Sequence, residues 1–299
     1  MIEIFVPATS ANLGPGFDCL GLALQLENKV VIEECDKEIE VICTDGQGKY
    51  IEKDATNLIY IAVKRMFDIT GKPMPGIRLT LTNDIPVCRG LGSSAACITA
   101  GCIAGNILTG AGFSLDELIS IATELEGHPD NIVPAFVGGF TVSCMDNKKV
   151  VYTSINTANE LKFAVMHPDF TLPTSEARRV IPQSVSLKDA VYNISRTSLL
   201  TAAFMSGKYE LLGQACRDKL HQPYRKELIS GFDYIISKAM EKGAYAAFLS
   251  GAGPTIIAML NKSDNSFEAE MQSDLAELDD GWILKMVEMN CSGAFYKTV

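Results

Sequence analysis

The chain has 299 residues, of which 47% are hydrophobic and 21% charged, and it carries a net charge of −10 at pH 7. This length and composition predict a folded chain of about two domains, and the negative charge argues against nucleic acid as a partner. The longest apolar stretch, residues 95–108, is shorter than the roughly 18 to 20 residues that span a bilayer, so no membrane segment is expected. Nine cysteines without a C-x-x-C pair are typical of reduced thiols in a cytoplasmic protein.

The predicted elements alternate between strands and helices along the chain. Alternating hydrophobicity predicts strands at residues 2–7, 22–33, 39–44, 76–84, 140–144, 161–166, 244–249, 256–260 and 282–289. Helical periodicity and cap signals predict helices at 58–67, 95–108, 115–125, 174–181, 187–205, 208–217, 225–241 and 267–278. The strands at 22–33 and 39–44 are expected to form a hairpin or meander. A change to polar residues places a domain boundary near residue 155, so that the α+β chain divides into domains 1–155 and 156–299.

A loop of glycine and serine follows the strand at 76–84. It reads RGLGSS (residues 89–94) and leads directly into the apolar helix at 95–108. Glycines let a ligand approach the backbone, and the free N–H groups at a helix N-terminus bind anions, so this order predicts a phosphate-binding loop. Two alternatives stay open, namely a dinucleotide-binding turn of the pattern G-x-G-x-x-A and an ordinary loop before a buried helix. Pro86 and Arg89 lengthen the connection, which disfavours the dinucleotide turn.

Other polar segments contain residues that suit catalysis or binding. Asn12 and Asp18 stand in a glycine-rich loop expected at residues 8–21, and a carboxylate with an amide suits an ammonium or hydroxyl group; turn formation is the alternative. His128, Asp130 and Asn131 crowd into a loop expected at residues 127–139, where an aspartate can orient or deprotonate a hydroxyl.

Charged residues elsewhere have less specific signals. Glu124 and Glu126 lie at a helix C-terminus, where negative charge is unfavourable, so either is a candidate magnesium ligand or a solvated surface residue. Arg178 and Arg225 have guanidinium groups that suit a carboxylate, but most arginines are merely exposed.

Four ordered segments resemble the GHMP kinases, a superfamily that includes galactokinase and the homoserine, mevalonate and phosphomevalonate kinases. The segments read PATSANLGPGFD, GLGSSAA, EGHPDN and SGAGPT, and the first and third are similar to the homoserine kinase family in particular. The resemblance implies ATP-dependent phosphorylation of the side-chain hydroxyl of L-homoserine, a step in threonine biosynthesis. It also implies an α+β fold with two domains, an amino-terminal one with a left-handed βαβ crossover and a ferredoxin-like carboxy-terminal one. A homodimer is common among such kinases.

The same resemblance implies a role for each matched residue. Asn12, Asp18, Thr174, Arg178 and Arg225 would surround homoserine, with Asp18 at its amino group and the two arginines at its carboxylate. His128, Asp130 and Asn131 would lie beside the reacting hydroxyl, and Ser94 and Glu126 would bind Mg²⁺, with Glu124 as the alternative to Glu126. ATP would contact Asn57, Pro86, Arg89, Gly90, Leu91, Gly92, Ser93, Ser94, Ala95, Ala96, Gly251 and Gly253.

Three questions remain open at this point. Asp130 is either a true base or a group that positions the hydroxyl, since phosphoryl transfer through a loose transition state tolerates both. A GHMP kinase with a different small substrate is one alternative function, although an acid with two arginines favours a zwitterion. A non-catalytic ATP-binding protein is the other.

Overall fold

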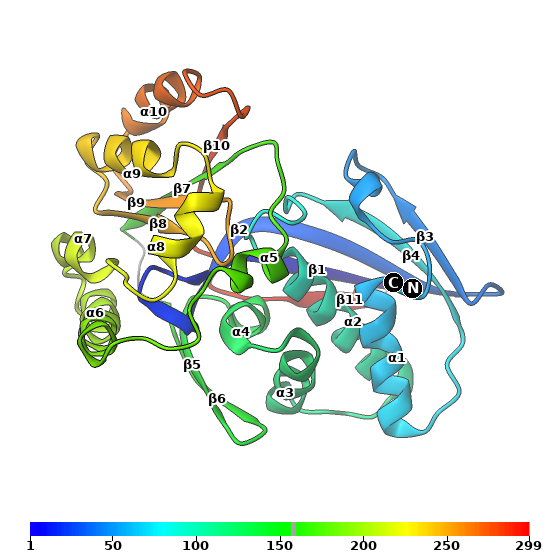
Figure 1. Ribbon diagram of the computed structural model, residues 1–299. Helices are drawn as coiled ribbons and strands as arrows, with labels where there is room; N and C mark the ends of the chain where they lie inside the picture. The colour runs from blue at the N-terminus through cyan, green and yellow to red at the C-terminus, as the bar shows by residue number, and fades with distance from the viewer. Residues whose placement is uncertain (157–159, 299) are drawn as a thin grey trace.

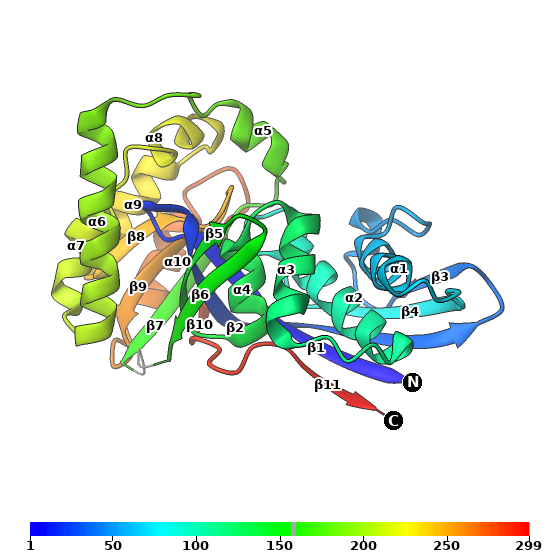
Figure 2. The ribbon, with the colours of Figure 1, turned by 90° about the horizontal axis from the view of Figure 1, so that it is seen from below.

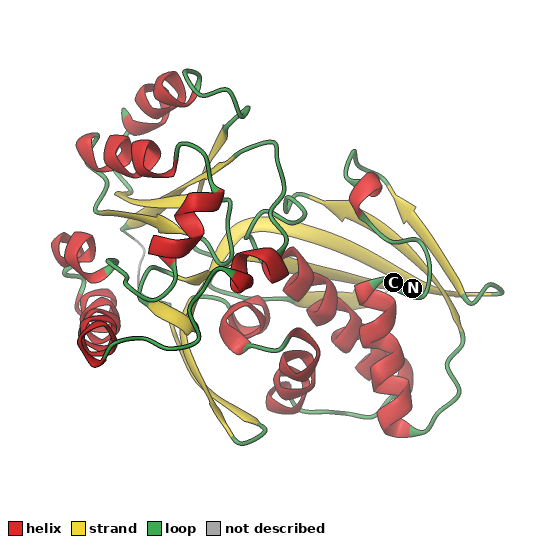
Figure 3. Cartoon of the chain, in the orientation of Figure 1, coloured by secondary structure: helices red, strands yellow, loops and turns green. Residues whose placement is uncertain are grey.

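The computed structural model describes residues 1–156 and 160–298 and contains two β-sheets with helices around them (Figures 1 and 3). The strands are β1 (Ile2–Asn12), β2 (Gly16–Cys35), β3 (Ile39–Cys43), β4 (Gly76–Asn83), β5 (Phe140–Asp146), β6 (Lys149–Ile155), β7 (Leu161–His167), β8 (Ala246–Leu249), β9 (Ile256–Asn261), β10 (Ile283–Val287) and β11 (Phe295–Thr298). The α-helices are α1 (Leu58–Thr70), α2 (Ser93–Thr109), α3 (Leu115–Glu126), α4 (Pro129–Val137), α5 (Thr174–Arg179), α6 (Leu187–Ser206), α7 (Leu212–Ala215), α8 (Gln222–Arg225), α9 (Phe232–Glu241) and α10 (Phe267–Leu275). Short 3₁₀ helices are η1 (Gly48–Tyr50), η2 (Tyr209–Leu211) and η3 (Lys226–Leu228).

The first sheet is organised around the long strand β2. Its central order is β11-β1-β2-β4-β3, and β5 also pairs with β2 and carries β6 at its other edge. β3 runs parallel to β4 and is connected to it through α1, while β2 pairs with β4, so the expected hairpin or meander of β2 and β3 is wrong. A parallel pair needs a crossover connection, and α1 provides it. This is the βαβ unit of the fold; the hand of its crossover stays a prediction.

Helices α1 to α4 cover one face of this sheet, as Figures 1 and 2 show from two directions. α2 is buried almost all round, and its glycines lie against α1, where a side chain at Gly101 would come within 2.5 Å of Ala62. α4 packs closely on β2, and a Cβ atom at Gly21 would lie 2.1 Å from the carbonyl oxygen of Asp130. Small residues therefore let both helices approach their neighbours and set the position of the α4 N-terminus.

The second sheet has the order β10-β7-β9-β8, and all its pairs are antiparallel. The chain order β7-α9-β8-β9-α10-β10 with that strand order is the ferredoxin-like arrangement that the resemblance implied. Alternate residues of β7 enter different cores: Phe163 and Val165 join the core that reaches into the first sheet, whereas Ala164 and Met166 pack toward α9 and α10. The sheet is therefore buried on both faces. The α+β fold predicted from the sequence is confirmed by the solved structures described below.

Several expected elements differ from the structure. The segment expected as a loop at 8–21 is mostly strand, because β1 and β2 stay paired up to Asn12 and Gly16, with a register shift after Ala11, and only residues 13–15 separate them. The loop expected at 127–139 contains α4, which begins with Pro129 at its first turn. β6 and β11 were not expected, and α9 begins at Phe232 rather than at 225, after Gly231 in a left-handed conformation.

The predicted domain boundary lies beside residues 157–159, which are outside the described residues. β6 ends at Ile155 in the first sheet, and β7 begins at Leu161 in the second. The last strand then returns to the first sheet, where Thr298 of β11 pairs with Ile2, so the two ends of the described chain lie side by side. Among the described residues, no helix is long and apolar enough to cross a membrane.

Candidate active site

One cavity brings together residues from both sheets and from the helices between them. It is lined by most of the residues that the sequence singled out: Asn12, Asp18, Asn57, Arg89, Gly90, Gly92, Ser93, Ser94, Glu126, His128, Asp130, Asn131, Thr174, Arg178, Arg225 and Gly251. Five further predicted residues do not line it: Pro86, Leu91, Ala95, Ala96 and Gly253. Of these, Leu91, Ala95 and Ala96 bury their side chains in the core, so a ligand would meet only their backbone.

The glycine loop ends where α2 begins. Gly92 is the N-cap in a left-handed conformation (φ 69°), and no side chain caps the helix, which leaves its first N–H groups available to an anion. A Cβ atom at Gly92 would lie 1.9 Å from Oγ1 of Thr9. That hydroxyl is fully buried and donates to Oδ1 of Asn131 over 2.9 Å. The loop is therefore held directly against the polar residues of α4.

Ser94 and Glu126 meet at the end of the cavity beside the helix N-terminus. The Ser94 hydroxyl donates to Oε2 of Glu126 over 2.6 Å, and burial raises the pKa of the Glu126 carboxyl above its ordinary value although that hydrogen bond lowers it. Glu124 instead forms an ion pair with Arg65, and its side chain is 66% exposed. A hydroxyl and a carboxylate are the oxygen ligands that Mg²⁺ prefers, so the pair Ser94 and Glu126 fits this ion and Glu124 does not.

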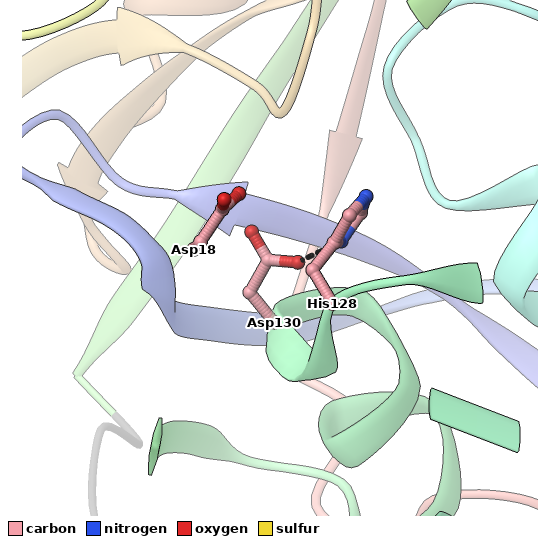
Figure 4. Close-up of side chains that lie close together, drawn as sticks. All are labelled: Asp18, His128 and Asp130. Carbon is pink, nitrogen blue, oxygen red and sulfur yellow. Dashed lines mark hydrogen bonds and ion pairs between the residues drawn. The ribbon is translucent and has the colours of Figure 1, made fainter. Parts of the chain in front are cut away.

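The N-terminus of α4 presents a histidine and an aspartate to the cavity (Figure 4). Asp130 is 1% exposed and lies in the first helical turn, where the helix dipole favours negative charge. Its Oδ1 atom is 2.6 Å from Nδ1 of His128. Burial lowers the pKa of His128, but the hydrogen bond and the charge of Asp130 raise it by more, so the net shift is upward. The two residues form one polar unit that faces Asp18.

Asp18 is positioned by the turn between β1 and β2. Its backbone N–H donates to Oδ1 of Asn12 over 3.1 Å, while Nδ2 of Asn12 donates to the carbonyl of Gly251. The carboxylate of Asp18 accepts two hydrogen bonds from Arg178, at 2.7 and 3.2 Å. Ligand atoms of Asp18, His128 and Asp130 lie within 4.8 Å of one another. These atoms are already paired with Arg178 or with each other, so the group is less suited to a metal ion than Ser94 and Glu126.

Arg225 lies deeper in the same part of the cavity and is 2% exposed. Its Nε donates to the carbonyl of Ala177, and its Nη1 donates to the carbonyl of Gly251 over 2.9 Å. Its guanidinium also lies 5.4 Å from the centre of the Phe17 ring. Burial, and next the nearby charge of Arg178, lower the pKa of Arg225 to about 10, so it stays a cation at neutral pH.

Two residues that are predicted to contact ATP, Arg89 and Asn57, also form hydrogen bonds with backbone groups of the protein. The Arg89 side chain is 7% exposed and donates to the carbonyls of Val87, Pro168 and Asp169, which connects the glycine loop to the second sheet. The Asn57 side chain accepts the N–H groups of Ile59 and Tyr60 as the cap of α1. Thr174, at the start of α5, is exposed.

Other residues of the site were not predicted from the sequence, although Thr9 and Phe17 stand in the segment PATSANLGPGFD. The cavity is also lined by Tyr50, Ile51, Leu81, Asn83, Val87, Cys88 and Cys97, none of which stands in a motif. Thr9, Phe17 and His221 lie behind the cavity and contact its polar residues. His221 stands four residues before Arg225, and this helical spacing is the one signal that connects them in the sequence.

Models of two protein domains match the chain. The GHMP kinases N terminal domain matches residues 57–139, and the GHMP kinases C terminal domain matches residues 200–277. The mevalonate kinase of Methanococcus jannaschii, at 18% identity and a TM-score of 0.72 over 97% of this chain and 98% of its own, has the same fold. The fold and the glycine-loop cavity thus define a GHMP kinase.

Close relatives narrow this assignment. The homoserine kinase of Caldicellulosiruptor bescii is 46% identical over 98% of this chain and 96% of its own length, and that of Clostridium botulinum strain Langeland is 45% identical over 98% and 97%. The crystal structure of a homoserine kinase from Cytophaga hutchinsonii has a TM-score of 0.88 and 28% identity, over 99% of this chain and 97% of that one. The chain belongs to the homoserine kinase family of the GHMP kinases.

Proposed function

We propose that the protein transfers the γ-phosphoryl group of ATP to the side-chain hydroxyl of L-homoserine, giving O-phospho-L-homoserine for threonine biosynthesis. The observation that carries the proposal is the cavity described above, in which an uncapped helix N-terminus and an oxygen-ligand pair lie next to paired ions of both signs. The first two features suit a nucleotide triphosphate with its metal, and the third suits a zwitterionic amino acid. Membership in the homoserine kinase family supports the same assignment.

In this proposal the donor half of the site is the glycine loop with α2. The free N–H groups from Ser93 onward bind the phosphates. Gly90 and Gly92 give the loop its left-handed backbone and let it lie directly against Ser250 and Thr9. Ser94 and Glu126 hold Mg²⁺. Bound there, the metal ion neutralises part of the charge of the phosphates.

The acceptor half consists of the residues around Asp18 and Asp130. Asp18 binds the amino group of homoserine, and Arg178 and Arg225 bind its carboxylate, because charge-assisted hydrogen bonds of this kind are strong and directional. Asp130 accepts a hydrogen bond from the reacting hydroxyl and directs it toward the phosphate. His128 fixes the orientation of the Asp130 carboxylate through the contact of 2.6 Å. Catalysis then rests mainly on positioning and charge stabilisation.

A turnover assay tests this proposal. The purified protein is given ATP and Mg²⁺ with L-homoserine, and in parallel with mevalonate, galactose or shikimate, and release of ADP is followed with detection of the phosphorylated product. L-Homoserine should stimulate turnover far more than the other alcohols. Stimulation by another alcohol alone would assign a different GHMP kinase activity. Tight binding of ATP without transfer to any alcohol would instead identify a non-catalytic ATP-binding protein.

The proposal includes the organisation of the protein. Residues 1–155 form the ATP-binding domain and residues 156–299 the second domain, with β11 completing the first sheet. All nine cysteines are free thiols, which supports a cytoplasmic location. A homodimer is proposed from the resemblance to such kinases, and sedimentation of the purified protein measures it.

A further inference from the structure

His221 is a buried histidine for which the mechanism above has no use. It stands at the N-cap of α8, four residues before Arg225, and its side chain is fully buried and does not line the cavity. The carboxylate of Asp218 accepts the backbone N–H groups of His221 and Gln222 over 2.9 and 2.7 Å. The Phe17 ring stacks on the imidazole, with 5.3 Å between ring centres. The ring is therefore fixed from several sides.

Chemistry dictates which nitrogen of this ring carries the proton. Nε2 lies 2.7 Å from the carbonyl oxygen of Gly14, and because a carbonyl can only accept, Nε2 must be the donor. Nδ1 lies 3.3 Å from Nη1 of Arg225, and because a guanidinium nitrogen can only donate, Nδ1 must carry the lone pair. The imidazole is therefore neutral and connects the turn after β1 to the guanidinium of Arg225. Burial lowers the pKa of His221, which agrees with this assignment.

The hydrogen bonds of Arg225 are thereby almost completely assigned. Nε donates to Ala177, and the two hydrogens of Nη1 go to Gly251 and His221. Among the described residues, Nη2 forms no hydrogen bond, and Arg225 lines the cavity. Because the guanidinium group is planar and rigid, fixing Nε and Nη1 also fixes the direction of Nη2.

We propose that His221 is a positioning residue for substrate recognition: its neutral imidazole holds the Arg225 guanidinium so that Nη2 is presented to the carboxylate of the acceptor. His221 acts on affinity for the amino acid, and it has no contact with the phosphoryl donor. This inference rests on the function proposed above, because it takes the ligand of Arg225 to be the carboxylate of homoserine.

Two conservative variants separate the two hydrogen bonds of the ring. In His221→Gln the amide nitrogen takes the place of Nε2 and keeps the bond to Gly14, but the acceptor for Arg225 is lost. In His221→Asn the amide oxygen takes the place of Nδ1 and keeps that acceptor. H221Q should raise the KM for L-homoserine by about tenfold or more, as expected for losing a hydrogen bond to a charged group. Its kcat and its KM for ATP should stay near the wild-type values, and H221N should raise the KM for L-homoserine less.

A double-mutant cycle tests whether H221Q raises the KM for L-homoserine by changing the orientation of Arg225. H221Q introduced into an Arg225→Lys background should raise the KM for L-homoserine no further, because lysine has no planar group to orient. Equal effects of H221Q in both backgrounds would overturn the proposal. A parallel rise of the KM for ATP would also overturn it, because this outcome indicates a general structural role.

A measurement on the wild-type protein is independent of how the variants fold. The chain has only three histidines, so nitrogen NMR of the labelled imidazoles resolves each of them. His221 should show the neutral tautomer with its proton on Nε2 at neutral pH, and its Nδ1 signal should shift on addition of L-homoserine but not of ATP. A proton on Nδ1, or no response to L-homoserine in a protein that turns it over, would refute the inference. Absence of turnover in the wild type would refute the proposed function instead.

Discussion

Replacement of Gly92 by alanine tests whether the glycine loop is as tightly constrained as its contacts indicate. The left-handed backbone at this residue (φ 69°) costs an alanine roughly 1–2 kcal/mol. The new Cβ would also lie 1.9 Å from Oγ1 of Thr9, so the threonine hydroxyl must move and its bond to Asn131 is lost. A buried polar atom that loses its partner costs about 1–3 kcal/mol. We therefore expect Gly92→Ala to lower the free energy of unfolding by roughly 2–5 kcal/mol, the sum of the two effects.

The other end of the same helix provides a matched control. Gly110 caps the C-terminus of α2 in the same left-handed region (φ 59°), and a Cβ atom there would meet nothing within 4 Å. Gly110→Ala should therefore show only the backbone effect, about 1–2 kcal/mol. The difference between the two variants measures the contacts that the new Cβ makes with Thr9 and Asn131.

Urea unfolding of both variants gives the two free energies, and turnover at varied ATP gives the effect on the nucleotide site. Gly92→Ala should raise the KM for ATP, because the displaced loop carries the first N–H groups of α2, whereas Gly110→Ala should not. Equal losses of stability in the two variants, or a Gly92→Ala enzyme with an unchanged KM for ATP, would refute this account of the loop.

Two more predictions concern single side chains. Ser94→Ala should raise the Mg²⁺ concentration needed for half-maximal turnover by about tenfold, because it removes one of two oxygen ligands. Ser93→Ala, at the neighbouring position of α2, should leave that concentration unchanged. Identical Mg²⁺ dependence of the two variants would exclude Ser94 as a ligand. Burial and the charge of Arg225 lower the pKa of His221, although the charge of Asp218 opposes them. We therefore expect the free energy of unfolding to fall as the pH decreases below the ordinary histidine value of 6.5. Below that pH the unfolded chain binds a proton that the folded chain does not. The slope approaches about 1.4 kcal/mol per pH unit, and urea unfolding of the wild type and H221N against pH should show a flatter curve for the variant.

The sequence alone could predict elements whose signals are local. The helix α1 begins at Leu58, as predicted, and extends three residues beyond its predicted end to Thr70. The Asn57 cap and the left-handed Gly71 act within a few residues of the helix that they bound. The capping box of Ser114 and Glu117 is present for the same reason. The strand, glycine loop and helix of the proposed phosphate-binding segment are likewise contiguous.

Elements that depend on distant partners could not be predicted in this way. Thr9 and Ser10 made the end of β1 resemble a loop, yet both are fully buried and their hydroxyls bond to Asn131 and Ser250. These partners lie more than a hundred residues away. α4 was missed because two prolines within nine residues usually indicate a loop, whereas Pro129 in the first turn lacks only an N–H that has no helical partner.

The candidate site shows the same division between local and distant signals. Motifs placed Ser94, Glu126 and Asp130 in one cavity, and the structure brings them together. Motifs could not show that the Arg89 side chain donates to three backbone carbonyls, since two of them, those of Pro168 and Asp169, belong to the segment that follows β7. Nor could they show the role proposed for His221, whose partners come from the turn after β1 and from α8.

The two arginines of the proposed acceptor site differ in the interactions that hold their guanidinium groups before a ligand binds. Arg178 is paired with Asp18, and because the two side chains are 38% and 35% exposed, such a pair contributes only about 0.2–1 kcal/mol. A zwitterion can replace both partners at once, its ammonium group facing Asp18 and its carboxylate facing Arg178, so that no ion is left unpaired. An acceptor with a carboxylate but no amino group, such as mevalonate, would separate the pair and leave Asp18 without a partner beside Asp130. In this proposal Arg225 stays in place because carbonyls and His221 hold it. The ion pair therefore selects an amino acid over an acceptor that carries a carboxylate alone, because that acceptor would leave the charge of Asp18 unpaired.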